Sequence, residues 1–415
     1  MDKLFERHDA YLAATPMRFV RSFASQIDWG LRLIIITGPK GVGKTTLIQQ
    51  HIKRHFAPDD RHVLYCSADS AYFANHSLID TADRFHRLGG RFLFIDEVHK
   101  YDNWSSEVKE IYDLHRDLHV VLSGSSLLQI NDGRTDLSRR KMEYRIPGLS
   151  MREFLHMSMG LEIEPIALPN LLKTPNAYCN QVKRLCHPLE HFGGYLRHGY
   201  YPFYFESPTA YQSRIEAVVN YIIDSELTQF RNVEAGNTRR IKALLKVLSQ
   251  MVPYEVDIAK LSRNIGIQRP TTLKYLRSLE EAALITRLFN SLDTVGDLQK
   301  PDKILLDNPN LLYTISDRAP EMGTVRETFF CNQLLAAGHR VEHGGLRSGD
   351  FIVDGDVTIE VGGRDKGFRQ VRNERRAFVA ADDIDSATTV TETHPRTGRS
   401  VELTKIPIWA FGFLY

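Results

Sequence analysis

This chain of 415 residues has little cysteine and no long hydrophobic run. Its cysteines are too few and too widely spaced to predict a disulfide framework; they are Cys66, Cys179, Cys186 and Cys331. The pair Cys179 and Cys186 lies near His187 and His191, but this spacing matches no common zinc pattern. No segment approaches the ~20 apolar residues that a membrane-spanning helix needs. We therefore expect no membrane partner.

An excess of one charge is also missing, because 53 basic residues offset 51 acidic ones. The bulk charge neither requires nor excludes nucleic acid, so any DNA contact needs a local basic face. The first residues, Met-Asp-Lys-Leu-Phe-Glu, contain acids and no apolar core, which is unlike a secretory signal. We expect a cytoplasmic protein of about two to four domains.

A glycine-rich loop between an apolar strand and a helix is the most informative pattern present. It has the form G-x-x-x-x-G-K-[ST], in which successive backbone N–H groups form an anion-binding nest. In this pattern Lys44 reaches the β- and γ-phosphates, and the Thr45 hydroxyl is a ligand of Mg²⁺. The predicted nucleotide-binding residues are Gly38, Pro39, Lys40, Gly41, Val42, Gly43, Lys44, Thr45 and Thr46.

A second apolar strand ends in two acids, Asp96 and Glu97. Next to a phosphate-binding loop, we expect Asp96 to complete the Mg²⁺ shell. Glu97 is then the candidate general base that orients the attacking water. The alternative is a buried strand that simply ends in two solvated acids. With both motifs present, the sequence predicts an NTPase.

Helical stretches and short apolar strands alternate from the start to about residue 156, which predicts a doubly wound α/β core with a mainly parallel sheet. The strand that ends at Ser123 is the candidate for a strand lying between those of the two nucleotide motifs. Residues 157–240 look helical and would form a lid.

Residues 241–310 change character and read as helix, glycine-containing turn, helix and strand. That order is typical of a helix-turn-helix with a wing. The residues expected on or near its second helix, where DNA contacts are made, are Thr271, Thr272, Lys274, Tyr275 and Arg277. The alternative is a winged helix used only for packing. Residues 311–415 read as a helix followed by several strands, the last of them predicted over 406–414, which fits a small α/β module.

Five motifs occur in one order: Gly38 to Thr45, Ile95 to Tyr101, Leu122 to Ser126, Asp136 to Arg140 and Pro147 to Phe154. With them the chain resembles the bacterial and archaeal AAA+ predicted ATPases, which carry a winged helix and a C-terminal nuclease-like domain of unknown function. The resemblance implies an AAA+ core at 1–156, a helical lid at 157–240, a winged helix at 241–310 and a restriction-endonuclease-like domain at 311–415. It also implies ATP with Mg²⁺.

Carried over by position, Ser123 or Ser125 would be the sensor of the γ-phosphate. Arg139 and Arg140 look like the paired arginines that family members present to a neighbouring subunit, so one is a candidate arginine finger in a homo-oligomer. The alternative is two solvated arginines on a helix surface. The preference for adenine rests on the resemblance, since no Asn/Thr-Lys-x-Asp guanine reader follows the second motif.

In the C-terminal module the resemblance suggests Glu327 on a helix and a second Mg²⁺ site formed by Asp350 and Glu360. The lysine expected two residues after Glu360 is replaced by Gly362, and Lys366 is the candidate substitute. The alternative is a nuclease scaffold kept for binding or assembly.

Three functions follow from these patterns. The first is an oligomeric, DNA-associated AAA+ ATPase. The second is a nucleotide-dependent switch or scaffold for a protein partner, and the third is an ATP-gated, Mg²⁺-dependent nuclease.

Overall fold

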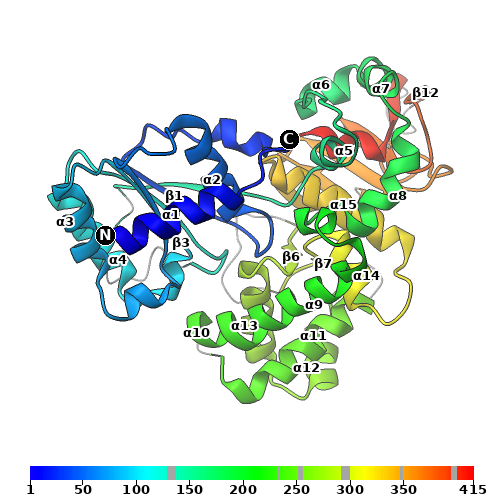
Figure 1. Cartoon of the computed structure of the whole chain (residues 1–415). Coiled ribbons are helices and arrows are strands. Elements are labelled where there is room, and N and C mark those ends of the chain that lie inside the picture. The colour runs from blue at the N-terminus through cyan, green and yellow to red at the C-terminus, as the bar shows by residue number, and fades with distance from the viewer. Residues whose placement is uncertain are drawn as a thin grey trace. The chain divides into compact units, whose positions relative to one another are not determined.

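The computed structural model describes residues 1–128, 137, 139–231, 233–250, 256–290, 300–345, 349–393 and 400–415. Two residues of the fourth family motif, Asp136 and Ser138, lie outside this range. The chain divides into two compact units, Met1–Pro147 and Gly148–Tyr415. Figure 1 labels many of their helices and some of their strands. Within the described residues, no helix has the length and apolar character needed to cross a membrane.

Five parallel strands form the sheet of the first unit, in the order β2–β3–β4–β1–β5. Their bounds are β1 Leu33–Thr37, β2 Val63–Ser67, β3 Phe92–Asp96, β4 His119–Ser123 and β5 Met142–Arg145. The expected additional strand is confirmed, because β4 pairs with β1 on one side and with β3 on the other. The carboxyl ends of β1, β3 and β4 therefore meet at one edge, where ligands of open α/β sheets bind.

Helices cover both faces of this sheet. They are α1 Asp2–Ala14, α2 Lys44–His55, α3 Leu78–Arg87 and α4 Trp104–Leu114, with the short helices η1 Ser22–Gln26, η2 Ala71–Ala74 and η3 Val98–Lys100. Side chains of α3 and α4 pack with Leu93 and Ile95 of β3 on one face. On the other face, His51 of α2 packs against Phe94. Because both faces are covered, the strands read as continuous apolar runs, and the predicted α/β core is confirmed.

The second unit begins with helices. These are α5 Met151–Met159, α6 Leu168–Lys173, α7 Pro175–Lys183, α8 Pro188–His198, η4 Pro202–Phe205, η5 Pro208–Ala210, α9 Tyr211–Tyr221, the π-helix η6 Ile222–Glu226, α10 Leu227–Arg231, η7 Ala235–Asn237 and α11 Thr238–Gln250. The segment from 211 to 231 is thus a nearly continuous helix interrupted by one wider turn. The helical character expected for 157–240 is observed.

The predicted order of helix, turn, helix and strand is also observed. Helix α12 Ile258–Ile265 ends at Gly266, whose φ of 66° lies in the left-handed region that glycine tolerates. Helix α13 Arg269–Glu281 follows, and β6 Ile285–Leu288 pairs antiparallel with β7 Lys303–Leu306. The expectation that Thr272 and Tyr275 face DNA is wrong, because both side chains are buried. Thr272 shares a hydrogen bond of 2.8 Å with Ser262 of α12.

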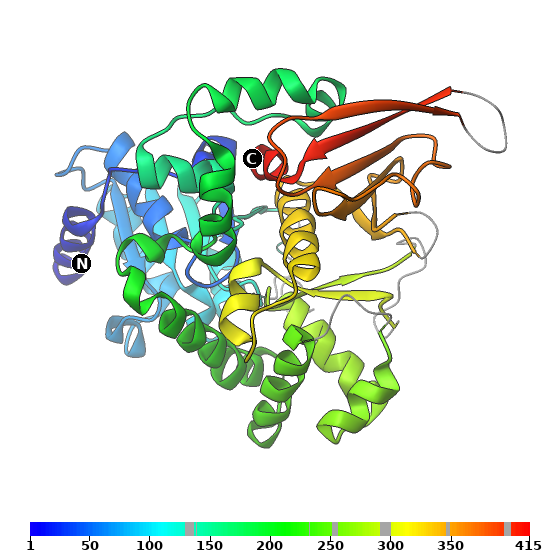
Figure 2. The same ribbon diagram turned by 90° about the vertical axis from the view of Figure 1, so that its right-hand side faces the viewer.

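A mixed six-stranded sheet, in the order β12–β13–β11–β10–β9–β8, forms the C-terminal part and is prominent in Figure 2. The strands of this sheet are β8 Val341–His343, β9 Phe351–Val353, β10 Val357–Gly362, β11 Ala377–Ala381, β12 Thr388–Thr393 and β13 Ser400–Pro407. The helices of this part are α14 Pro309–Ile315, α15 Met322–Ala336 and η8 Ile408–Phe413. The last strand expected from the sequence ends early, at Pro407, and the apolar residues after it form η8. A short apolar run that is buried on all sides does not distinguish strand from helix.

Candidate nucleotide-binding site

The loop between β1 and α2 has a backbone that only glycine accepts easily. Gly38 has φ 146° and Gly43 has φ 95°, both in the region that L side chains rarely adopt. A Cβ atom added to Gly38 would lie 2.3 Å from the carbonyl oxygen of Ile146. The loop therefore lies tightly against the chain that follows β5, with no room for a side chain at its first position.

Lys44, the first residue of α2, is buried within this loop. Its Nζ donates hydrogen bonds of 2.9 Å to the carbonyl oxygens of Gly38 and Pro39. These carbonyls hold the ammonium inside the curve of the loop, where a phosphate bound by the loop N–H groups would meet it. The role predicted for Lys44 depends on this position of its ammonium group.

Asp96 stands at the centre of a hydrogen-bond network at the carboxyl edge of the sheet. Its Oδ2 accepts hydrogen bonds from the hydroxyls of Thr45, at 2.7 Å, and Tyr65, at 2.8 Å. Its Oδ1 accepts from the hydroxyl of Ser123 and, at 3.1 Å, from the N–H of Glu97. Four donors thus supply the hydrogen bonds that this buried carboxylate would otherwise lack. The same burial and the charge of Asp96 raise the pKa of Tyr65.

The pair Thr45 and Asp96 fits Mg²⁺. Two neighbouring oxygen ligands in an octahedral Mg²⁺ shell lie about 3.0 Å apart, since each Mg–O distance is about 2.1 Å. The Thr45 hydroxyl and the Asp96 carboxylate are already at 2.7 Å. Both are hard oxygen donors of the kind that Mg²⁺ prefers. The residues present therefore fit the ion that the sequence predicts.

Glu97 follows Asp96 in a left-handed conformation with φ 53°. Its side chain is 27% exposed, and its Oε2 lies 3.3 Å from Nε2 of His99. Burial, followed by the positive charges of Lys100, Lys44 and Lys40, lowers the pKa of His99 to about 3. His99 is therefore neutral near pH 7, and the side chain of Glu97 keeps its access to water.

The two candidate sensor serines have different surroundings. The Ser123 hydroxyl contacts Asp96, whereas the Ser125 hydroxyl accepts a hydrogen bond of 3.3 Å from the N–H of Leu127. The backbone N–H of Ser125 donates to Nδ1 of His99 at 3.3 Å, which leaves the proton of the neutral ring on Nε2, facing Glu97. Ser123 thus joins the Asp96 network, and Ser125 supports the group beside Glu97.

The two candidate finger arginines also differ. Arg140 forms a two-pronged ion pair with Asp113, with Nε–Oδ1 and Nη2–Oδ2 distances of 2.9 and 3.2 Å. Arg139 is exposed, and no ion pair with it occurs among the described residues. Neither arginine belongs to the Asp96 network. Of the two, Arg139 is the one whose side chain is presented to solvent.

Two residues of this site escaped the sequence analysis. Arg21 is buried, and its guanidinium donates to the carbonyl oxygen of Val42, in the loop, at 2.9 Å. It also donates through both terminal nitrogens to the carbonyl oxygen of Pro147 at 3.1 Å. Tyr65, already described, is the other. Arg21 lies in no recognisable motif, and Tyr65 reads as an ordinary strand residue, so neither carries a sequence signal.

The acids predicted in the C-terminal module face a common region of the second unit. Asp350 accepts a hydrogen bond of 2.8 Å from the N–H of Val361. Burial raises the pKa of Glu327 to about 7, with Lys303 opposing the shift and Asp350 adding to it. Burial and then Asp350 also raise the pKa of Glu360. The carboxylates are therefore close enough to repel one another.

Two lysines pair with two of these three acids. Nζ of Lys303 lies 2.5 Å from Glu327, and Nζ of Lys366 contacts Oε1 of Glu360. A Cβ atom added to Gly362 would lie 2.6 Å from Cγ of Lys366, so the lysine stem covers the glycine. Lys366 thus places an amine beside the position where the family pattern has its own. No cluster of three or more potential metal ligands occurs among the described residues.

Comparisons with known proteins support the first unit's core. Residues 31–155 match a family model described as AAA domain, and residues 189–321 match one described as Domain of unknown function (DUF8612). The chain therefore carries a region similar to AAA domains. No curated protein sequence matches the chain.

Solved structures with some similarity include C. elegans PCH-2, with 17% identity and a TM-score of 0.23 over 38% of this chain and 44% of that one. AMPPCP-bound DnaA from Aquifex aeolicus has 17% identity and a TM-score of 0.26, over 62% of this chain and 84% of that one. A katanin structure concerned with self-assembly has 15% identity and a TM-score of 0.23, over 40% of this chain and 60% of that one. The chain spans less than half of the PCH-2 chain that it matches.

Proposed function

We propose that this protein binds ATP with Mg²⁺ and hydrolyses it to ADP and phosphate. The observation that carries the proposal is the hydrogen bond of 2.7 Å between Thr45 and Asp96. It brings the end of the glycine-rich loop and the end of a second strand together at one edge of the sheet, as a phosphate and metal site requires. The AAA-domain match over residues 31–155 supports the same conclusion.

Each residue has a definite task in this proposal. The loop N–H groups and Lys44 bind the phosphates, and Thr45 and Asp96 hold the metal. Bound Mg²⁺ supplies positive charge to the phosphate oxygens. Glu97 orients the attacking water, and Ser123 keeps Asp96 and the N–H of Glu97 in register, since its hydroxyl donates to one and accepts from the other at 3.2 Å.

The remaining parts of the proposal concern organisation. We assign the ATPase core to residues 1–156, a helical lid to 157–240, a winged helix to 241–310 and a nuclease-like domain to 311–415. Turnover is proposed to occur in a homo-oligomer in which Arg139 of one subunit completes the site of the next. Exposure of Arg139 supports its choice over Arg140, whose guanidinium is paired with Asp113.

DNA is the proposed stimulus. On α12 and α13 the exposed basic side chains are Lys260, Arg263, Arg269 and Lys274. They supply the local basic face that the nearly neutral chain needs for phosphate contacts. The competing function is a switch in which ATP sets the arrangement of domains for a protein partner.

The deciding experiment measures ATP turnover of the wild type, Lys44→Ala and Glu97→Gln with and without duplex DNA, while light scattering follows mass in solution. We expect Lys44→Ala to lose nucleotide binding, and Glu97→Gln to keep binding while losing turnover. Binding and turnover that survive in Lys44→Ala would refute the ATPase. Turnover that is indifferent to every nucleic acid would favour the switch.

A second activity, Mg²⁺-dependent nucleic-acid cleavage, is favoured by one observation, the contact between Lys366 and Glu360. Lys366 supplies the amine that would otherwise come from a lysine at the position of Gly362. If this activity exists, Asp350→Ala and Lys366→Ala abolish nicking of a supercoiled plasmid, whereas Lys44→Ala changes only its dependence on ATP. An absence of cleavage by the wild type with Mg²⁺ or Mn²⁺ would remove the nuclease from consideration.

A further inference from the structure

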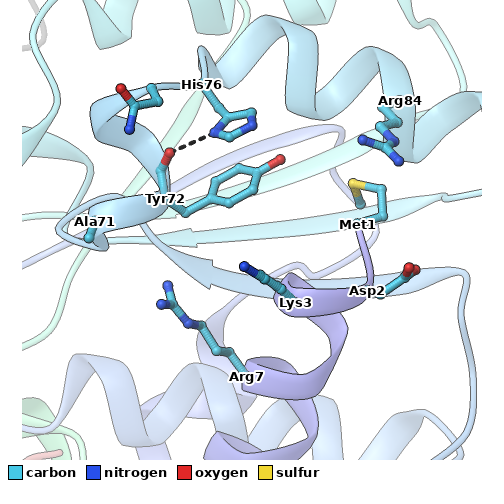
Figure 3. Close-up of a pocket in the computed structure, with 9 residues that line it drawn as sticks. Met1, Asp2, Lys3, Arg7, Ala71, Tyr72, His76 and Arg84 are labelled. Carbon is cyan, nitrogen blue, oxygen red and sulfur yellow. Dashed lines mark hydrogen bonds between the residues drawn. The ribbon is translucent and has the colours of Figure 1, made fainter.

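A cavity of about 460 Å³ in the first unit belongs to none of the functions above. Its walls come from the start of α1, from η2 and the segment after it, and from α3. Figure 3 shows its lining side chains. Cavities of this size accept small organic ligands. None of the residues assigned to ATP binding or hydrolysis lines it.

Positive charge dominates the lining. Lys3, Arg7 and Arg84 contribute three cations, against one acid, Asp2. Lys3 and Arg84 are exposed, and neither forms an ion pair with a residue that the structure describes. Arg7 donates a hydrogen bond to the hydroxyl of Ser70. A group of cations without carboxylate partners favours an anionic ligand.

An aromatic pair adds a second kind of contact. The rings of Tyr72 and His76 are stacked, with centroids 4.1 Å apart and an angle of 7° between their planes. Nδ1 of His76 lies 2.9 Å from the carbonyl oxygen of Tyr72, and because a carbonyl only accepts, Nδ1 is the protonated nitrogen. In Figure 3 Lys3 and Arg7 lie across from His76, with the ring of Tyr72 between. The cavity thus combines a planar platform with nearby cations.

We propose that this cavity binds one nucleotide unit, with its base on an outer face of the stacked Tyr72–His76 pair and its phosphate among Lys3, Arg7 and Arg84. A planar base and a phosphate separated by a sugar are the groups that such a lining recognises. Asn75, also in the wall, offers both a donor and an acceptor to a base edge. The unit comes either from single-stranded nucleic acid or from a free mononucleotide. The site is additional to the proposed ATP site.

The cavity is connected to the ATP site through a short piece of chain. Ser67, the last residue of β2, pairs with Asp96 in the sheet, and the N–H of Ala68 donates to the backbone oxygen of Asp96 at 2.8 Å. Ser70 then caps η2, which carries Tyr72. A ligand on Tyr72 therefore acts on the segment that is hydrogen-bonded to the proposed metal-binding acid.

Photo-crosslinking of the full chain tests the proposal directly. An oligothymidylate carrying 5-iododeoxyuridine is irradiated with the protein while a non-hydrolysable ATP analogue saturates the ATP site. We expect the crosslink to map to the peptide that contains Tyr72 and His76. Thymidine 5′-monophosphate that protects against the crosslink would identify the free mononucleotide as the source, and protection by unlabelled oligothymidylate alone would identify the strand.

Variants separate this site from the winged helix. Lys3→Gln with Arg84→Gln, and separately Tyr72→Leu, should each weaken oligothymidylate binding about tenfold. The control pair Arg54→Gln with Arg116→Gln removes the same charge from exposed positions outside the cavity and should leave binding unchanged. ATP turnover without nucleic acid should stay at the wild-type level in all of them. A crosslink that maps only elsewhere, or an equal loss in the control pair, would overturn the proposal.

Discussion

The hydroxyl of Thr45 donates to the carboxylate of Asp96 across 51 positions of sequence, at 2.7 Å. The bond joins the first turn of α2 to the end of β3. In the sheet, β4 lies between β3 and β1, the strand that precedes α2. Whatever disturbs either end of this contact should disturb the proposed metal site. The predictions below follow from the groups that hold it in place.

Tyr65→Phe removes one donor from Asp96 and keeps the ring. A hydrogen bond to a charged group contributes about 1.5–3 kcal/mol, so we expect a loss of that order in the free energy of unfolding and weaker ATP turnover. Urea unfolding and steady-state kinetics measure the two effects. The matched control is Tyr101→Phe, whose hydroxyl donates to Glu107 at 2.8 Å instead. If both variants impair turnover equally, the Asp96 contact is not responsible.

Gly38→Ala should abolish nucleotide binding, because the new Cβ would lie 2.3 Å from the Ile146 carbonyl oxygen and φ is 146°. We expect the free energy of unfolding to fall by about 1–3 kcal/mol. Gly193→Ala in α8 is the control, since nothing lies within 4 Å of its Cβ position. It should raise stability by about 0.5–1 kcal/mol. Calorimetry of nucleotide binding and thermal unfolding measure these effects. Nucleotide binding retained by Gly38→Ala, or a lower stability of Gly193→Ala, would contradict the expectation for that variant.

Arg21→Ala leaves the carbonyls of Val42 and Pro147 without their guanidinium donor. We expect a KM for ATP raised about tenfold and a lower melting temperature, because the loop loses a buried, charge-assisted hydrogen bond. Arg18→Ala is the control, as Arg18 is exposed. A normal KM in Arg21→Ala would show that the loop holds its shape without this arginine.

Acidification should destabilise the first unit through His51. Burial and then the charge of His55 lower the pKa of His51 from 6.5 to about 3. Between these values the unfolded chain binds a proton that the folded chain does not, so stability is complete above pH 6.5 and falls as pH decreases toward 3. Burial lowers the pKa of His8 as well, so its contribution has the same sign.

Melting temperatures recorded from pH 7.5 to 5 check this expectation. His51→Gln should flatten the decline on acidification, whereas His62→Gln should not, because the His62 side chain is 67% exposed. The stacking of His51 on Trp29, with centroids 3.7 Å apart, lets tryptophan fluorescence follow the same transition. Identical profiles for the wild type and His51→Gln would assign the acid sensitivity to other groups.

Arg139→Ala should lower ATP turnover about a thousandfold if its guanidinium completes a neighbouring site. Arg140→Ala should cost much less, because Arg140 is held by Asp113 in its own subunit. Mixing Arg139→Ala with Lys44→Ala protomers should restore part of the activity, since some interfaces then combine an intact loop with an intact arginine. Turnover that stays at the wild-type level in Arg139→Ala would remove this residue from the proposed mechanism.

The sequence predicted the parts of the site that lie in continuous motifs. Gly38 to Thr45 and the pair Asp96 and Glu97 have spacings typical of phosphate- and metal-binding motifs, so they are recognisable without the fold. The hydrogen bonds of Arg21 are different, because one of them spans 126 positions and any residue type can supply the accepting carbonyl. Tyr65 becomes relevant only because β2 pairs with β3.

Surface and core were harder to separate on the second helix of the helix-turn-helix. Thr272 and Tyr275 are polar enough to suggest a DNA contact, yet the Thr272 hydroxyl finds its partners inside the protein, the Ser262 hydroxyl and the Gln268 carbonyl oxygen. At the C-terminus, an apolar run gave no sign that Pro407 ends the strand and η8 begins. In both places the local sequence pattern is ambiguous, and tertiary packing determines which side chains are buried and where the strand ends.

Pro147 ends the first unit and Gly148 begins the second. The planar guanidinium of Arg21 touches the Pro147 carbonyl and the Val42 carbonyl together. As long as these bonds persist, the loop at Val42 and the chain at residue 147 can move only together. The last residue of the first unit is therefore tied to the position of the glycine-rich loop.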